Sequence, residues 1–156
     1  MIISFFGHSS FNKTEAHEQK LLSFLEEKVG DFPADFYLGG YGAFDDFAFK
    51  CCQKYKNEHP SVSLIFITPY ITVEYQQNHL KDQKEKYDFI IYPEIEQKPL
   101  KFAIFYRNRW MVDKADFIIC CIDHSWGGAF KAYQYAKQKK KSIFNISEKD
   151  IDKTKE

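Results

Sequence analysis

Short apolar runs alternate with longer amphipathic or polar segments along this sequence, and no other feature constrains the fold as strongly. The runs are continuously apolar at their centres and do not alternate between polar and apolar residues. Strands of this kind are buried on both faces, as in parallel sheets that helices cover on each side. The sequence therefore predicts an α/β protein with a mainly parallel sheet and helices on both faces. The predicted strands occupy residues 1–7, 34–40, 62–70, 87–94, 116–122 and 142–146.

Amphipathic segments separate most of these runs and are predicted to be helices. Asn12 and Glu15 have the spacing of a capping box at the start of the first. Residues 72–86 are polar and only weakly periodic, which indicates an excursion over the surface that could include a short helix. Residues 147–156 form a polar tail that is predicted to be flexible. The four predicted helices occupy residues 12–29, 43–59, 99–115 and 127–141.

Charge and hydropathy exclude several classes of protein. Lys plus Arg number 22 and Asp plus Glu also number 22, so the formal net charge is zero. A neutral chain has no bulk attraction to nucleic acid or to a membrane, and neither is an expected partner. No apolar run approaches the roughly 20 residues that a membrane span needs. The first residues lack the basic leader and the long apolar segment of a signal peptide.

The four cysteines form two adjacent pairs, Cys51–Cys52 and Cys120–Cys121. Neighbouring cysteines seldom bridge each other, and this spacing is not that of a zinc site. We therefore expect buried thiols in the reducing cytoplasm, with no metal ion and no cofactor. The aromatic content, 16 Phe and 10 Tyr, makes an interface between copies of the chain plausible.

A glycine-rich turn follows the second predicted strand in the stretch YLGGYGAFDDFAFK. Glycine lets a backbone approach a ligand closely, and two carboxylates at the start of a helix suit hydroxyl or amino groups of a ligand. The alternative is a tight turn without a ligand, in which the helix dipole favours the acidic residues. The candidate binding residues of this turn are Gly39, Gly40, Gly42, Asp45 and Asp46.

A second glycine turn, SWGGAFK, follows the strand at 116–122 and opens a helix without a carboxylate. Backbone N–H groups at such a helix start attract an anion. A simple tight turn is again the alternative. Taken together, the two turns suit a nucleotide or a phosphoribosyl compound along one edge of the sheet. The candidate binding residues of the second turn are Ser125, Trp126, Gly127, Gly128 and Lys131.

Three further residues are candidates on their position alone. Arg107 precedes the strand that leads into the second turn, and an arginine there can bind phosphate through its planar fork, although a solvated helix face is the alternative. His8 follows the first strand and could contact a ligand. Asp123, the carboxylate nearest the second turn, could serve as a base.

The segment RNRWMVDKAD, followed by an apolar strand and a glycine turn, resembles the SLOG superfamily, which includes LOG-type phosphoribohydrolases, DprA-type proteins and the YpsA-like (DUF1273) family. Arg107, Met111, Ala115 and Asp116 fall at the spacing of the LOG-type motif, and Asn108 stands where that motif has lysine. The first glycine turn, and GHSS after the first strand, resemble the YpsA-like family most closely.

The resemblance covers about residues 1–146 and implies one Rossmann-like domain that binds a nucleotide or a nucleotide derivative. It also adds Gly7, beside His8, to the expected ligand-binding residues. LOG-type enzymes hydrolyse an N-glycosidic bond with a glutamate in the second motif. In this sequence no Asp or Glu occurs between His124 and Ile146, so that glutamate has no counterpart.

We therefore expect a protein that senses or sequesters its ligand. The first alternative is an N-glycosidase acting on nucleoside monophosphates, in which Asp46 or Asp123 would supply the catalytic carboxylate. The second alternative is an interaction module in a stress or phage-conflict system, for which residues 72–86 would be the distinguishing surface.

Overall fold

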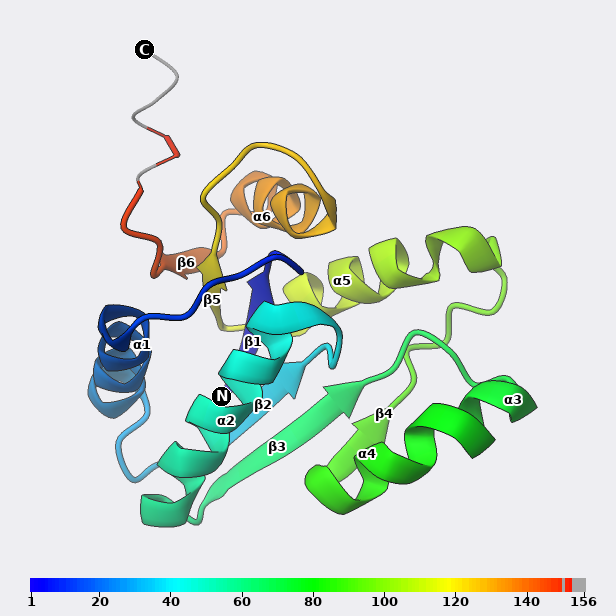
Figure 1. Cartoon of the computed structure of the whole chain (residues 1–156), viewed down its shortest axis with the longest axis horizontal. Coiled ribbons are helices and arrows are strands. Elements are labelled where there is room, and N and C mark those ends of the chain that lie inside the picture. The colour runs from blue at the N-terminus through cyan, green and yellow to red at the C-terminus, as the bar shows by residue number, and fades with distance from the viewer. Residues whose placement is uncertain (150, 153–156) are drawn as a thin grey trace.

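A sheet of six parallel strands forms the centre of the structure, a computed structural model that describes residues 1–149 and 151–152. The strand order is β4-β3-β2-β1-β5-β6, so that the first strand lies inside the sheet (Figure 1). The prediction of one α/β domain with a mainly parallel sheet is confirmed. The strands are β1 (Ile2–Gly7), β2 (Ala34–Leu38), β3 (Val62–Ile67), β4 (Phe89–Ile91), β5 (Phe117–Cys121) and β6 (Ser142–Asn145).

Helices cover both faces of this sheet. Side chains of α1 and α2 belong to one buried cluster, and side chains of α5 and α6 belong to a second cluster on the opposite face. The segment between β3 and β4 is helical as well and lies beside β4 (Figure 1). The helices are α1 (Glu15–Lys28), α2 (Gly42–Glu58), α3 (Val73–Tyr75), η1 (Gln76–Leu80), α4 (Lys81–Lys86), η2 (Leu100–Phe102), α5 (Ala103–Lys114) and α6 (Gly128–Gln138).

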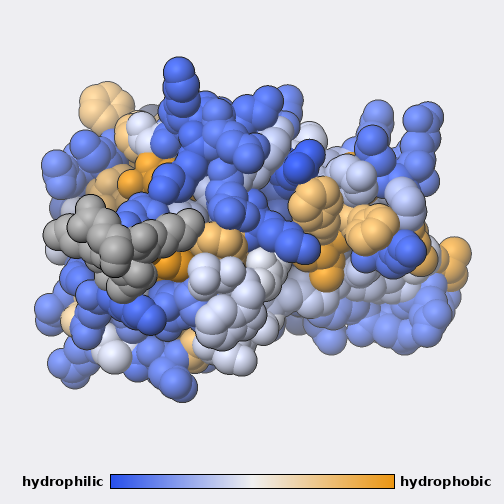
Figure 2. All heavy atoms as spheres, turned by 90° about the horizontal axis from the view of Figure 1, so that it is seen from above, coloured by the Kyte–Doolittle hydropathy of each residue, from blue (hydrophilic) through white to orange (hydrophobic). Residues whose placement is uncertain are grey.

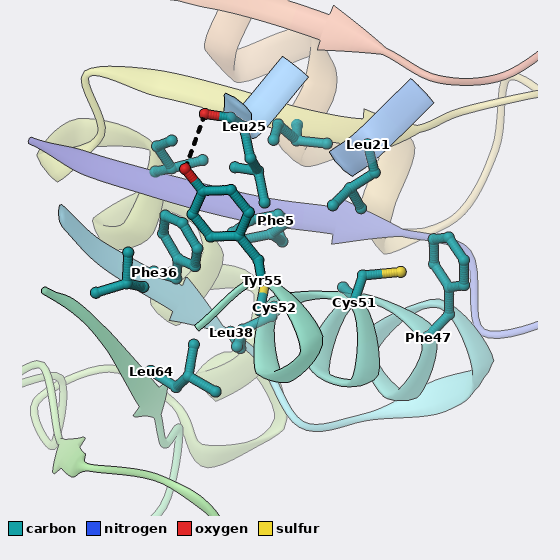
Figure 3. Close-up of a cluster of buried hydrophobic side chains, with 14 of the residues drawn as sticks. Phe5, Leu21, Leu25, Phe36, Leu38, Phe47, Cys51, Cys52, Tyr55 and Leu64 are labelled. Atoms are coloured by element: carbon teal, nitrogen blue, oxygen red, sulfur yellow. Dashed lines mark hydrogen bonds between the residues drawn. The ribbon is translucent and has the colours of Figure 1, made fainter. Parts of the chain in front are cut away.

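The first cluster shows why the strands read as continuous apolar runs. Phe5 and Phe36 point from β1 and β2 toward α1 and α2, and their rings meet edge to face with centroids 5.6 Å apart. Leu21 and Leu25 of α1 are fully buried against them (Figure 3). Tyr55 of α2 closes this layer, because its hydroxyl donates to the backbone carbonyls of Leu25 and Gly30. A polar group is thus satisfied inside an apolar core.

The second cluster uses the alternate residues of the same strands. Phe6, Ile65 and Ile118 point toward α5 and α6, where Met111 is fully buried. Ser4, the polar residue in the middle of β1, is fully buried on this side. Its hydroxyl donates to the backbone carbonyl of Met111 at 2.8 Å, which ties β1 to α5.

The structure corrects one prediction made from local sequence and adds detail to another. The capping box of α1 is formed by Thr14 and His17 rather than by Asn12 and Glu15: Thr14 Oγ1 accepts from the His17 N–H, and His17 Nδ1 accepts from the Thr14 N–H. Both pairs have the same spacing, so the point at which the chain turns into the helix decides between them. The surface excursion at 72–86 is helical along most of its length.

The four cysteines are buried and none is in a disulfide, as predicted for structural thiols. Burial raises the pKa of Cys51 and of Cys121 to about 12, so these thiols stay protonated near neutral pH. In the tail, Ile151 is buried within the second cluster. Residues 150 and 153–156 of the predicted flexible tail lie outside the described residues.

Hydrophilic side chains cover most of the face seen from above, and hydrophobic ones form small separate patches between them (Figure 2). The exposed apolar residues include Leu100 and Phe102 of η2, and Ile104 at the start of α5. Among the described residues, no helix has the length and apolar character needed to span a membrane.

Candidate functional site

The strand order creates a crevice at the carboxyl edge of the sheet. β1 is followed by α1 on one face, whereas its neighbour β5 is followed by α6 on the other face. The two connecting loops therefore diverge, and open α/β sheets bind ligands at such a switch point. Register brings the loops together, because Gly7 at the end of β1 pairs with Cys121 at the end of β5.

A pocket of about 440 Å³ lies in this crevice. Its volume is within the range of small-molecule sites. Four loops or helices supply its walls: the loop after β1, the first glycine turn after β2, one side of α5, and the second glycine turn after β5. The lining residues are Phe5, Phe6, Gly7, His8, Ser9, Ser10, Gly39, Tyr41, Asp45, Ile104, Arg107, Asn108, Met111, His124, Trp126, Gly127, Gly128 and Ala129.

Gly39, in the first glycine turn, lies next to the side chains of Asp45 and Arg107. A β-carbon at this position would lie 2.9 Å from the Asp45 carboxylate and 3.2 Å from both terminal nitrogens of Arg107. A larger residue would therefore separate or displace these groups. The glycine here leaves room for the buried Asp45 carboxyl group and the buried Arg107 guanidinium, which both line the pocket.

Asp45 is almost completely buried, and its Oδ2 accepts a hydrogen bond from the Tyr41 N–H at 2.9 Å. Burial raises the pKa of Asp45 from 3.8 to about 6, and Arg107 and the Tyr41 N–H oppose that rise. A carboxyl group with a pKa close to neutrality in a cleft is typical of functional sites. It can accept a hydrogen bond when ionised and donate one when protonated.

Arg107 is buried as well, and its guanidinium joins three parts of the fold. Nη1 donates to the carbonyls of Gly39 and Ile67 at 2.8 and 2.7 Å, and Nε donates to Asn108 Oδ1 at 3.0 Å. These carbonyls lie at the carboxyl ends of β2 and β3. Burial lowers the pKa of Arg107 while Asp45 raises it, and an arginine remains charged at neutral pH. The positive charge lies directly under the pocket.

The second glycine turn opens α6 toward the same pocket. Gly127 precedes the helix with φ of 93°, a conformation that favours glycine. Neither Gly127 nor Gly128 would bring an added β-carbon within 4 Å of another atom, so this end of the helix is open. The backbone N–H groups at the start of an α-helix have no partner within the helix. Such N–H groups can attract an anion, so this helix start remains the candidate anion site at the pocket edge.

His8, Asp123 and His124 meet at the mouth of the pocket. His124 Nδ1 lies 2.7 Å from Asp123 Oδ1, and His8 Nε2 lies 3.6 Å from the same oxygen. The two imidazole rings stack with centroids 3.4 Å apart, and the exposed Trp126 packs on His124. Burial lowers the pKa of His8, the neighbouring His124 lowers it further, and Asp123 opposes the shift.

The structure brings together residues of both predicted glycine turns, but not every predicted residue lines the pocket. Gly7, His8, Gly39, Asp45, Arg107, Trp126, Gly127 and Gly128 do. Asp46 forms an ion pair with Lys50 at 3.1 Å and lines a separate groove between α1 and α2. The other predicted residues that are absent from the lining are Gly40, Gly42, Asp123, Ser125 and Lys131.

Sequence reasoning did not assign Ser9, Ser10, Tyr41 or Asn108 to the site. The two serines directly follow His8 in a turn between a strand and a helix, and hydroxyl groups in such a turn were the available signal. Tyr41 and Asn108 gave no such signal. Tyr41 lies two residues after Gly39, and Asn108 directly follows Arg107. Both therefore line the pocket together with these neighbours.

Comparison with known proteins adds a likeness of fold. No family model and no curated protein matches this chain. Among solved structures, it is similar to DNA processing protein A from Helicobacter pylori, described for its single-stranded DNA binding mode, with a TM-score of 0.62 and 18% sequence identity. The match covers 93% of this chain and 64% of that one, so the chain spans less than two thirds of that protein. The likeness shows a shared Rossmann-like fold.

Proposed function

We propose that this protein binds a nucleotide or a nucleotide derivative in the pocket at the β1–β5 switch point, and that it senses or sequesters this ligand. One observation carries the proposal: Gly39 of the first glycine turn and Gly127 and Gly128 of the second line the same pocket. The start of α6, which is the proposed anion site, and the buried Asp45 carboxyl group thus line one cavity of about 440 Å³. A nucleotide combines the matching groups, a phosphate at one end and hydroxyl and amino groups at the other.

The phosphate is assigned to the start of α6. Helix N-termini carry a partial positive charge and present free N–H groups, and Arg107 adds a full positive charge beneath the pocket. Because Nη1 and Nε of Arg107 are already engaged by protein oxygens, Nη2 is the guanidinium nitrogen left for a direct contact with a phosphate. Ser9 and Ser10 also line the pocket and offer hydroxyl groups.

The sugar or the base is assigned to the first glycine turn. Asp45 lies at the pocket floor with a pKa of about 6, so it can accept a hydrogen bond from a ribose hydroxyl or an exocyclic amine. Trp126 is 68% exposed and packs on His124, which provides an aromatic surface at the pocket mouth. Nucleobases stack on such surfaces.

Binding without hydrolysis fits the distribution of carboxylates best. LOG-type enzymes place a glutamate in the second motif, and this chain has no Asp or Glu between His124 and Ile146. Asp46, one of the two candidates to replace it, is paired with Lys50 and lies outside the pocket lining. Asp123, the other, is hydrogen-bonded to His124 and lies outside the pocket lining.

The decisive test compares nucleoside monophosphates and diphosphates with the matching nucleosides by calorimetry on the wild type and on two variants of one residue. Gly128→Asp places a negative charge at the anion site, and Gly128→Ala adds only a methyl group in open space. We expect Gly128→Asp to weaken nucleotide binding at least tenfold, to leave nucleoside binding unchanged, and Gly128→Ala to behave like the wild type. Equal loss for nucleotide and nucleoside, or no nucleotide binding by the wild type, would contradict the proposal. Chromatography of the same mixtures measures release of free base, which we expect to be absent.

A second candidate ligand is single-stranded DNA, bound through one terminal nucleotide. The similar structure is described for single-stranded DNA binding, and an exposed Trp126 packed on a histidine suits base stacking. The zero net charge argues against a long electrostatic footprint. Titration with a short oligothymidylate distinguishes the two ligands. Binding to the oligonucleotide that exceeds mononucleotide binding and falls steeply with salt would favour DNA.

A further inference from the structure

The group formed by His8, Asp123 and His124 has a composition that the nucleotide proposal does not require. The register of β1 and β5 places residue 8 beside residues 122–124, so two distant parts of the sequence contribute to it. Each side chain offers one ligand atom, and these atoms lie within 4.8 Å of one another. Two imidazole nitrogens and one carboxylate oxygen are the ligands that Zn²⁺ and similar ions take in open, solvent-accessible sites.

The second observation is that the His8 side chain is buried without a hydrogen-bond partner for Nε2 among the described residues. This side chain is only 7% exposed. Buried polar side-chain atoms are nearly always paired in folded proteins, so an unpaired one points to a bound partner. This nitrogen lies 3.6 Å from an Asp123 carboxylate oxygen, which is longer than a hydrogen bond. In the tautomer with its proton on Nδ1, the Nε2 lone pair is available to a ligand.

We propose that His8, Asp123 and His124 bind one divalent transition-metal ion, Zn²⁺ or an ion with similar ligand preferences, at the mouth of the pocket. A hard ion such as Mg²⁺ or Ca²⁺ prefers oxygen ligands and does not match two imidazoles. Both histidines line the pocket, so the open coordination positions of the ion face the cavity. A water molecule or an anionic group of a ligand completes the coordination there.

Metal binding requires one movement. The imidazole rings of His8 and His124 are nearly parallel, 18° apart, and stacked, whereas a metal ion lies in the plane of each ring that binds it. His8 is buried, while the His124 side chain is 21% exposed and follows the end of β5. We therefore expect His124 to rotate away from the stack and to exchange its hydrogen bond with Asp123 for a bond to the ion.

The test is a titration of the untagged, chelator-treated protein with Co²⁺, followed by absorption spectroscopy, and with Zn²⁺, followed by calorimetry. We expect one ion per chain, ligand-field bands of nitrogen and oxygen coordination, and no thiolate charge-transfer band, because the cysteine thiols are buried and protonated. His8→Ala, Asp123→Asn and His124→Ala each should weaken binding at least tenfold.

The Asp123 and His124 variants and one control variant make the result decisive. Asp123 is exposed and His124 is partly exposed, so their variants remain informative even where His8→Ala fails to fold. His59→Ala is the matched control, because His59 also contacts two carboxylates, Glu26 and Asp31, outside the pocket. Loss of binding in His59→Ala alone, a thiolate band, or uptake that survives Asp123→Asn and His124→Ala would overturn the proposal. The titrations contain no nucleotide, so the metal site and the nucleotide site are judged separately.

Discussion

Asp45 and Asp46 are adjacent in the sequence, yet the structure gives them opposite environments. Asp45 is 8% exposed beneath the pocket, while the Asp46 side chain is 63% exposed and paired with Lys50. Successive residues on a helix point about 100° apart, so only one of two neighbours can face a given pocket. The sequence indicated the pair of aspartates as candidates. The rotation of α2 about its axis decides that Asp45, and not Asp46, faces the pocket.

Burial of Asp45 predicts an unusual pH dependence of stability. Its pKa is about 6 in the folded chain and 3.8 in the unfolded chain. Between these values the unfolded state loses its proton first, so the contribution of Asp45 to the free energy of unfolding falls as pH rises from about 4 to 6. The full shift corresponds to about 3 kcal/mol at 1.36 kcal/mol per pKa unit.

Asp45→Asn removes this titration and keeps an oxygen for the Tyr41 N–H. Urea unfolding at pH 4 and pH 7 should show the variant gaining up to about 3 kcal/mol relative to the wild type between the two values. Asp46→Asn, on the exposed side of the same helix, is the control and should show no such gain. Parallel pH profiles for wild type and Asp45→Asn would contradict the assigned environment.

We expect Arg107 to stabilise the fold as well as to supply a positive charge to the pocket. Arg107→Ala leaves the carbonyls of Gly39 and Ile67 and the Asp45 carboxylate without their cation. We expect a loss of about 3–5 kcal/mol in the free energy of unfolding at pH 7. Arg109→Ala, which removes an exposed arginine of the same helix, should cost far less.

The double variant Arg107→Ala/Asp45→Asn tests the coupling between these two residues. Removing the buried acid should recover part of the loss, because no unpaired charge then remains at the pocket floor. Strict additivity of the two single effects at pH 7 would show that Asp45 and Arg107 do not interact.

At the scale of elements, the start of α1 offers the sharpest prediction. Thr14→Ala removes the side-chain oxygen that accepts from the His17 N–H and should lower the free energy of unfolding by about 1 kcal/mol. Asn12→Ala removes the residue that sequence spacing alone selected and should change it by no more than a few tenths of a kcal/mol. Chemical denaturation of both variants decides between the two capping boxes, and a larger loss in Asn12→Ala would refute the observed one.

Most elements could be predicted from the sequence because their signals are local. Apolar runs such as FIICC, and helix starts after glycine turns, need no knowledge of the rest of the chain. The exact ends of the helices, and the residues that cap them, were harder to predict from the sequence. Whether Thr14 or Asn12 caps α1 depends on the path of the loop after β1, and the helices between β3 and β4 have little apolar periodicity to indicate them.

At the scale of the whole molecule, the sequence could predict that the two glycine turns share one edge, since parallel strands end together. It could not predict which side chains of each turn face inward. Lys131 is exposed and lies outside the pocket lining, and Arg107 donates to backbone carbonyls across β2 and β3. The cluster of His8 with Asp123 and His124 depends on the pairing of β1 with β5, which spans most of the chain.

The segment after β6 is predicted to stabilise the whole fold. Ile151 is 3% exposed within the cluster that α5 and α6 form on the sheet, and the Tyr133 hydroxyl of α6 donates to Asp152. Ile151→Ser should cost about 2–4 kcal/mol, whereas Lys149→Ser, at an exposed position nearby, should be close to neutral. Equal thermal midpoints for the two variants would show that Ile151 is not part of the core.

The central place of β1 has a consequence for how the chain reaches its native state. One edge of this strand can pair as soon as β2 is made, but the other edge waits for β5, which begins at Phe117. During synthesis on the ribosome, an open strand edge therefore persists until most of the chain has emerged. Contacts of such long sequence separation slow folding, and open edges favour mispairing. We expect slower refolding than for a helical bundle of similar length, and a nascent chain that benefits from a holding chaperone until β5 is complete.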